Sequence, residues 1–200
     1  GRYGARGSGS LGKAECGVWG AVQSRLKPRT GWLIEDPRGW GRFAGAEIIG
    51  AAGTGRRLLV ITVMFAPRSS EEGSGWVCQQ EAMSEMMMGE DDVAKRGIEK
   101  DPGRQALRDL HDAVYKRVND INRETAVVVG GDFNMSWGEE GGGPFGSMKG
   151  LAEALHLKNV MMEKHGKQGK MPWTFATAET TIDHMLVSEP LMTSVRAAGV

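Results

Sequence analysis

The run AVVVGGDFNMSW at Ala126–Trp137 constrains the fold of this chain more than any other segment. Val127–Val129 form a bounded run of β-branched residues, which is typical of a strand buried on both faces of a sheet. Two glycines end the run, because glycine lets the backbone turn without a Cβ clash. The pattern therefore predicts that Asp132 and Asn134 lie at the exit of a rigid strand.

Asp132 and Asn134 bring a carboxylate and a carboxamide to this predicted strand exit. Oxygen ligands of this kind suit Mg²⁺ or Mn²⁺, and the carboxylate can also act as a general base. The same residues fit an ordinary Gly-Asp turn that carries no chemistry. The segment by itself leaves both interpretations open.

Two further segments narrow the choice. Upstream, Arg57–Arg68 reads RLLVITVMFAPR, and downstream, Trp173–Leu191 reads WTFATAETTIDHMLVSEPL. In this order and at these spacings, the Phe-Ala-Pro strand, GGDFN and IDHMLVS resemble the endonuclease/exonuclease/phosphatase superfamily. That family includes pancreatic deoxyribonuclease, abasic-site and retrotransposon endonucleases, inositol-polyphosphate 5-phosphatases and neutral sphingomyelinases. The resemblance covers residues 17–200.

The resemblance implies an α/β fold, here a partial four-layer sandwich of two mixed β-sheets flanked by helices. It implies that Asp132 orients or deprotonates the attacking water and that Asn134 helps to hold the phosphate. It also implies that Asp183 supports the site. Mg²⁺ or Mn²⁺ is the implied cofactor, with Asp132 and Asn134 as its ligands.

Three departures from the family pattern bear on activity. The family's metal-binding glutamate precedes the segment that matches residues 17–26, and there this chain has only Glu15, without a strand context. Phe65 stands where the family usually has Tyr or His, and its ring cannot exchange a proton. The family's later Ser-Asp-His segment has no match before Val200. We therefore expect a fragment with little activity of its own.

His184 directly follows Asp183 and has two possible roles. Side chains alternate between the two faces of a strand, so if Asp183 faces the site, His184 faces the opposite way and is a packed or hydrogen-bonded residue. A bulge at Asp183 would reverse this and make His184 catalytic. His156 and His165 have no Cys or carboxylate partner at metal-ligand spacing.

Length and composition predict one domain, since 200 residues with 40% hydrophobic content can bury one sizeable core. Residues 1–16 are rich in Gly, Ser and Arg and are expected to be disordered, which leaves residues 17–200 as the partial domain. Residues 69–103 are expected to be a loosely ordered acidic insertion, because they carry nine Asp and Glu against three Lys and Arg.

The best helix predicted in the chain follows Asp101-Pro102, where Asp can cap and Pro suits the first turn. Its apolar stripe at helical spacing comprises Leu107, Leu110, Val114, Val118 and Ile121. Because this helix precedes the GGDFN strand, it predicts a strand–helix–strand unit.

The net charge of zero conceals a basic first third, in which residues 1–68 carry eleven Lys and Arg against four Asp and Glu. Such a surface can bind phosphates, and Trp32 and Trp40 lie among Arg38 and Arg42, where they could stack on bases. A solvated basic surface with buried tryptophans explains the same residues.

The chain has no apolar run long enough to cross a bilayer and no signal-peptide pattern, and Cys16 and Cys78 lie far apart. These features predict an intracellular protein, nuclear or cytoplasmic, with reduced thiols and no membrane partner.

The leading hypothesis is a metal-dependent phosphodiester hydrolase domain, endonuclease-like, derived from a retroelement and acting on DNA. One alternative is a non-catalytic remnant, or a module that binds nucleic acid or a protein partner. The other is a phosphoinositide or sphingomyelin phosphohydrolase. The sequence leaves all three open.

Overall fold

A computed structural model describes residues 2–6, 17–21, 25–52, 54–88, 98–119, 124–138, 145–165, 174–175, 177 and 180–198. The elements, in chain order, are β1 (Arg2–Arg6), β2 (Gly17–Ala21), the 3₁₀ turn η1 (Lys27–Arg29), β3 (Thr30–Glu35), β4 (Phe43–Ile49), β5 (Arg57–Met64), α1 (Gly75–Met88), α3 (Pro102–Asn119), β6 (Thr125–Asp132), α4 (Met148–Ala154), β7 (Leu157–Asn159), α5 (Val160–His165), β8 (Asp183–Ser188) and α6 (Glu189–Met192).

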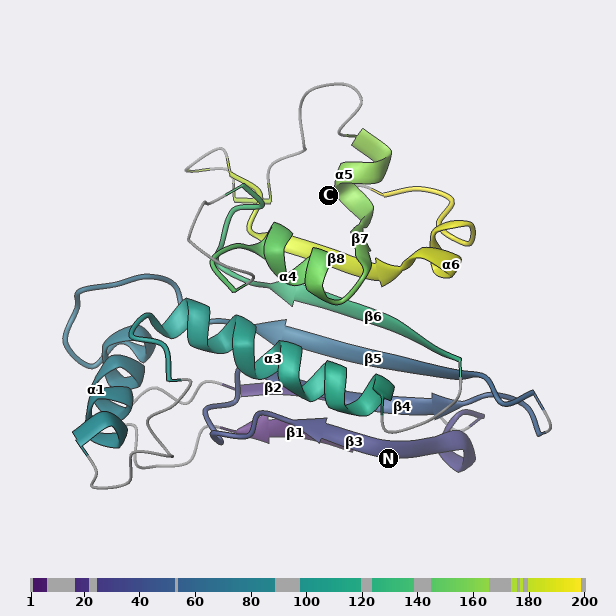
Figure 1. The fold of residues 1–200 in the computed structure, drawn as a ribbon, viewed down its shortest axis with the longest axis horizontal. Helices are drawn as coiled ribbons and strands as arrows, with labels where there is room; N and C mark the ends of the chain where they lie inside the picture. The colour runs from purple at the N-terminus through teal and green to yellow at the C-terminus, as the bar shows by residue number, and fades with distance from the viewer. Residues whose placement is uncertain are drawn as a thin grey trace.

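Six strands form one mixed sheet in the order β3-β4-β5-β6-β8-β7 (Figure 1). Strands β5 and β6 are parallel, and the other neighbours are antiparallel. The fold is therefore α/β with a mixed sheet, as the sequence predicts.

The parallel pair exists because α3 connects β5 to β6 across one face of the sheet. Asp101 caps this helix, since its side chain accepts the Arg104 N–H at 3.0 Å. Leu107, Leu110 and Val114 lie on its buried side. The predicted helix and its stripe are confirmed, except at Ile121, which lies outside the described residues.

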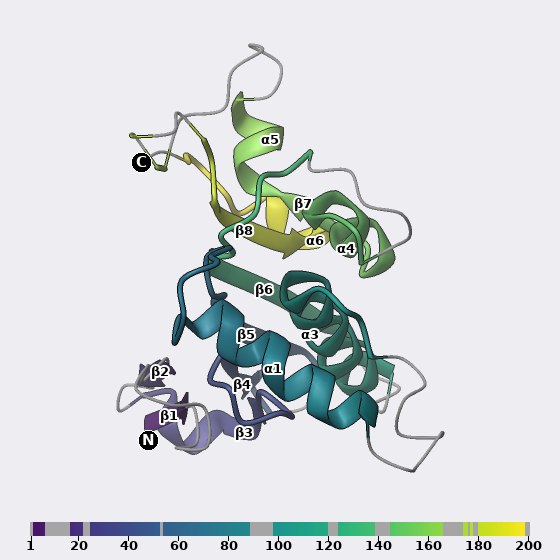
Figure 2. The same cartoon turned by 90° about the vertical axis from the view of Figure 1, so that its left-hand side faces the viewer.

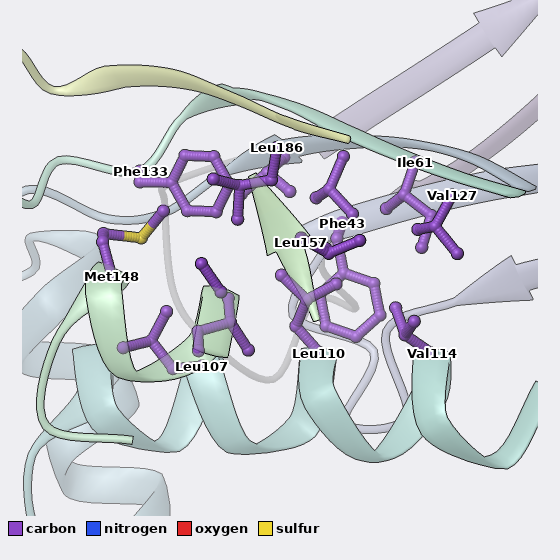
Figure 3. Packing of buried hydrophobic residues seen from close by; sticks show 14 of the residues in the cluster. Phe43, Ile61, Leu107, Leu110, Val114, Val127, Phe133, Met148, Leu157 and Leu186 are labelled. Carbon is purple, nitrogen blue, oxygen red and sulfur yellow. The ribbon is translucent and has the colours of Figure 1, made fainter. Parts of the chain in front are cut away.

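The hydrophobic core lies between the sheet and helices α3 and α4 (Figure 3). Phe43, Leu59 and Val129 point into it from three adjacent strands and are fully buried. Each fully buried side chain of this size contributes about 1.5–3 kcal/mol to stability. The core thus fixes the strand ends that carry the candidate site.

The opposite face of the sheet is covered in part by β1 and β2, which pair with each other and contact β3, β4 and β5 (Figure 2). The described residues hold three layers, namely helices, a six-stranded sheet and a two-stranded sheet. This is the expected sandwich in partial form.

Two segments that the sequence predicts to be disordered or loosely ordered contain regular elements. Residues 2–6, within the segment expected to be disordered, form β1. This strand forms because five residue pairs with β2 give its backbone groups hydrogen-bond partners. Residues 7–16 lie outside the described part. Residues 75–88, within the expected loose insertion, form α1. Trp76 and Met83 are buried on the same side of that helix, which packs near α3 (Figure 2), so tertiary contacts order it. Residues 89–97 are not described.

Among the described residues, no helix is both long enough and apolar enough to cross a membrane. Cys78 in α1 is a free thiol, and Cys16 lies outside the described part.

Candidate active site

The predicted site residues gather where β6 ends and β8 begins. Asp132 is the last residue of β6, Asp183 is the first of β8, and the two are direct partners across the antiparallel pair. Direct partners in such a pair present their side chains on the same face of the sheet. The structure therefore brings two carboxylates together at one sheet edge.

Asn134 is held beside this pair by a tight turn. Its backbone N–H donates to Asp132 Oδ1 at 2.9 Å, and its side-chain Nδ2 donates to the backbone oxygen of Phe65 at 2.8 Å. The φ angle of Asn134 is 49°, a left-handed conformation that asparagine adopts more readily than most residues. Asparagine at position 134 therefore suits the left-handed backbone conformation of the turn as well as the chemistry of the site.

Phe65 holds the site through its backbone. Its ring is buried and packs edge-on against Phe133, with centroids 5.4 Å apart. The backbone N–H of Phe65 donates to the backbone oxygen of Asp132 at 2.9 Å, and the backbone oxygen of Phe65 accepts from Asn134 Nδ2. The side chain offers no proton or hydrogen bond at this position, but the backbone ties β5 to both site residues.

Thr174 orients the start of β8. Its Oγ1 accepts the backbone N–H of Ile182 at 2.9 Å and that of Asp183 at 3.0 Å. Two donors on one hydroxyl fix the chain just before and at Asp183. The Thr-Phe pair that contributes to the sequence resemblance therefore has a structural function in this chain.

The electrostatic environment makes ionisation of Asp132 unfavourable. Burial raises the pKa of the Asp132 carboxyl, and the negative charge of Asp183 raises it further. Hydrogen bonds from Asn134, and the charge that His184 carries when protonated, oppose this rise in the Asp132 pKa without cancelling it. A partly buried carboxylate with a raised pKa, beside a second carboxylate, is the kind of group that accepts a proton or attracts a cation.

The donor set also fits a small divalent cation. Mg²⁺ is commonly held by one or two carboxylates, with water and substrate oxygens completing the octahedron. Asp132 and Asp183 supply two carboxylates, and Asn134 adds an amide oxygen. Within the described residues, no group of three His, Cys, Asp or Glu could hold a metal, so protein ligands alone do not make a closed cage.

His184 lies on the other face of β8, as the alternation of strand side chains predicts. It pairs with Gly131, is only 3% exposed, and contacts Phe133 and Trp137 at ring-centroid distances of 5.9 and 6.1 Å. Its two ring nitrogens are hydrogen-bonded to Asn159 and to the backbone of Met135. The prediction of a packed, hydrogen-bonded histidine is confirmed.

The basic first third does not provide the base-stacking cluster considered from the sequence. Trp40 is buried, and Arg38 and Arg42 form ion pairs with Asp109 at 2.7 and 2.6 Å. Trp32 is 63% exposed, with Arg117 over its ring at 5.3 Å. The alternative of a solvated basic surface with buried tryptophans is correct for Trp40, whereas Arg38 and Arg42 are ion-paired rather than solvated.

A cavity of about 480 Å³ opens beside Asp183 and His184. Its other walls are mostly apolar and come from α5 and the chain after α6. The lining includes Val160, Met161, Thr174, Met185, Val195 and Ala197. The carboxylate edge is therefore accessible next to a hollow of small-molecule size.

Asp132→Asn is expected to stabilise the fold at pH 7 in buffer with EDTA. The raised pKa means that the ionised carboxylate costs folding free energy at neutral pH, a cost that disappears as pH falls through the folded-state pKa. Asparagine retains the Oδ1 that accepts the Asn134 N–H. We expect Tm to rise by about 2 °C, with the difference shrinking near pH 4.

Asp112→Asn, at a side chain that is 65% exposed, is the control and should leave Tm unchanged. A lower Tm for Asp132→Asn would contradict this.

Comparison with known proteins gives structural similarities only. No family model and no curated protein matches the sequence. The chain is similar to the 3′ phosphatase NExo from Neisseria bound to a DNA hairpin (17% identity, 96% of this chain and 69% of that one, TM-score 0.46) and to the human Nocturnin catalytic domain (15%, 94% and 61%, 0.44). It is also similar to a beta toxin variant from Staphylococcus aureus with bound magnesium ions (14%, 76% and 44%, 0.36). The chain spans less than half the length of the beta toxin structures it matches.

Proposed function

We propose that this chain is part of a metal-dependent phosphodiester hydrolase domain of the endonuclease/exonuclease/phosphatase type. The observation that supports the proposal is the meeting of Asp132 and Asp183 as cross-strand partners, with Asn134 locked beside them. Paired carboxylates and an amide at one strand edge can hold a divalent cation and activate water for the hydrolysis of a phosphoester.

In this proposal, each residue has a role in the reaction and a role in holding the cation. Asp132 takes the proton of the attacking water, which suits a carboxyl whose pKa is raised. Asn134 directs its amide at the phosphate, and Asp183 keeps the local charge negative. A divalent cation, when bound by Asp132, Asp183 and Asn134, would offset the negative charge of the phosphate oxygens.

The proposed substrate is nucleic acid, on the strength of the sequence resemblance to nucleases, and the proposed origin is a retroelement by the same resemblance. Arg68 follows β5, in which Met64 pairs with Asp132, and its side chain is 72% exposed while pairing with Asp101 at 3.0 Å. An exposed guanidinium there can bind a phosphate of a polyanion.

A non-catalytic remnant is the second candidate, favoured by the absence, within the described residues, of a three-ligand metal group. The two candidates differ in what the carboxylate pair does. A hydrolase site binds a divalent cation at Asp132 and Asp183, whereas a remnant does not need to.

Mn²⁺ titration, followed by water proton relaxation, tests the proposal. We expect weak binding to the wild-type chain that becomes at least about tenfold weaker in Asp132→Asn and in Asp183→Asn. Asp112→Asn again serves as the matched control and should bind as wild type. Equal Mn²⁺ affinity in all four proteins would overturn the metal site.

Cleavage by the chain alone should be little or none, even with Mg²⁺, because the glutamate ligand, the polar group at Phe65 and the terminal histidine have no match. Plasmid DNA, an abasic duplex, a phosphoinositide and sphingomyelin are the substrates to assay. Robust cleavage lost in Asp132→Ala would contradict this expectation, and the substrate cleaved would identify the class.

A further inference from the structure

The buried His184 ring has fixed partners in Met135 and Asn159, and the backbone of Thr181 also hydrogen-bonds to it. Its Nε2 lies 2.9 Å from the backbone oxygen of Met135, and its Nδ1 lies 3.2 Å from Nδ2 of Asn159. Met135 is the residue directly after Asn134. The histidine therefore connects the turn that carries a site residue to the strand-to-helix junction at Asn159.

The orientation of the Asn159 amide follows from the start of α5. Asn159 Oδ1 accepts the backbone N–H of Met161 at 3.0 Å and that of Met162 at 3.3 Å, so it acts as the N-cap of this helix. With the oxygen directed at these donors, the Nδ2 group faces His184. The amide cannot be reversed without leaving the helix start uncapped.

These partners select one form of the imidazole. Because Asn159 Nδ2 is a donor, the facing Nδ1 of His184 must accept, and because the Met135 carbonyl can only accept, Nε2 must carry the proton. The ring is thus neutral and protonated on Nε2.

We propose that His184 and Asn159 are positioning residues, which hold Asn134 in its left-handed conformation by anchoring the Met135 carbonyl. Asn134 needs such an anchor, since a φ of 49° is disfavoured for a residue with a side chain. Its other ties run to Asp132 and to the Phe65 backbone, on the opposite side of the turn. The His184 bond holds the turn from its C-terminal side.

The anchor is separate from the sheet itself. The His184 ring bonds to Met135 and Asn159, whereas the β6–β8 pairing is made by backbone groups. Loss of the ring nitrogens should therefore loosen the turn and leave the pairing intact. The role of this anchor in catalysis rests on the function proposed for Asp132 and Asn134, but the anchor itself does not.

Amide hydrogen exchange and imidazole ¹⁵N NMR test the proposal without any assay of activity. In the wild type at pH 7, we expect His184 to be neutral and protonated on Nε2. In His184→Phe, exchange at the Asn134 backbone N–H should accelerate about tenfold, while that at Val129, in the core of β6, stays unchanged. His184→Gln, which retains a donor for Met135, should recover most of the Asn134 protection.

Asn159→Ser is a second variant for the same measurements, for use if His184→Phe does not fold. Serine retains a capping oxygen for α5 but removes the amide donor, so part of the His184 population should shift to the Nδ1–H form and Asn134 should exchange faster. A wild-type ring protonated on Nδ1, unchanged Asn134 exchange, or equal loss at Asn134 and Val129 would overturn the inference. If Mn²⁺ binding fails while these exchange results hold, the proposed function fails and the anchor stands.

Discussion

Gly131→Ala is expected to destabilise the protein by about 4 kcal/mol or more, a large part of the about 5–15 kcal/mol stability of a typical domain. A Cβ at Gly131 would overlap the backbone oxygen of Val63 and lie 3.0 Å from the Val63 carbon and nitrogen. The φ of 143° is also a conformation that only glycine adopts readily. Because Val63 belongs to the parallel partner strand, neither backbone can move without breaking the β5–β6 pairing next to Asp132.

Gly130→Ala is the matched control for this substitution. A Cβ at Gly130 would meet the His184 oxygen at 3.6 Å, an ordinary contact distance, and the loss of unfolded-state entropy would partly offset any strain. Urea unfolding followed by circular dichroism compares the two variants. Equal midpoints for Gly130→Ala and Gly131→Ala would show that the close approach of the strands is not maintained.

The elements around the site could be predicted from the sequence because their signals are local. The valine run and two glycines fix the end of β6, and the period of the apolar residues in α3 requires a crossover to that strand. Alternation along β8 then places Asp183 and His184 on opposite faces. These steps use residues within one element or its immediate neighbour, whereas the meeting of Asp183 with Asp132 is implied only by the family resemblance.

Features built from distant residues could not be predicted in the same way. Helix α1 has no clear apolar period, and it is ordered by burial of Trp76 and Met83 near α3. The bond between Asn159 and His184 joins residues 25 positions apart, and that between Arg42 and Asp109 spans 67. A single sequence carries no signal that pairs such residues, and Arg42 looks there like any other surface arginine.

The buried ion cluster around Arg42 is the second site at which one substitution should have a large effect. The Arg42 side chain is 1% exposed and donates to Asp36 at 2.6 and 2.8 Å and to Asp109 at 2.6 Å. Although burial opposes ionisation, the Arg42 guanidinium holds the pKa of the Asp36 carboxyl below its usual value. The arginine therefore stabilises the charged form of Asp36.

Arg42→Met should therefore cost about 3–5 kcal/mol at pH 7, since it leaves Asp36 buried without its partner. In the wild type the lowered pKa stabilises the fold above pH 4, and this contribution is lost as pH falls through the folded-state value. In the variant, burial acts on Asp36 against only the backbone N–H groups of residues 38 and 42, so the Asp36 pKa should rise and the deficit should shrink in acid. Urea unfolding between pH 7 and pH 4 measures both effects.

The double variant Arg42→Met with Asp36→Asn should recover more than half of the loss at pH 7, because it removes the buried charge that has no partner. An Arg42→Met protein as stable as the wild type at pH 7 would show that this cluster does not hold β4 to α3.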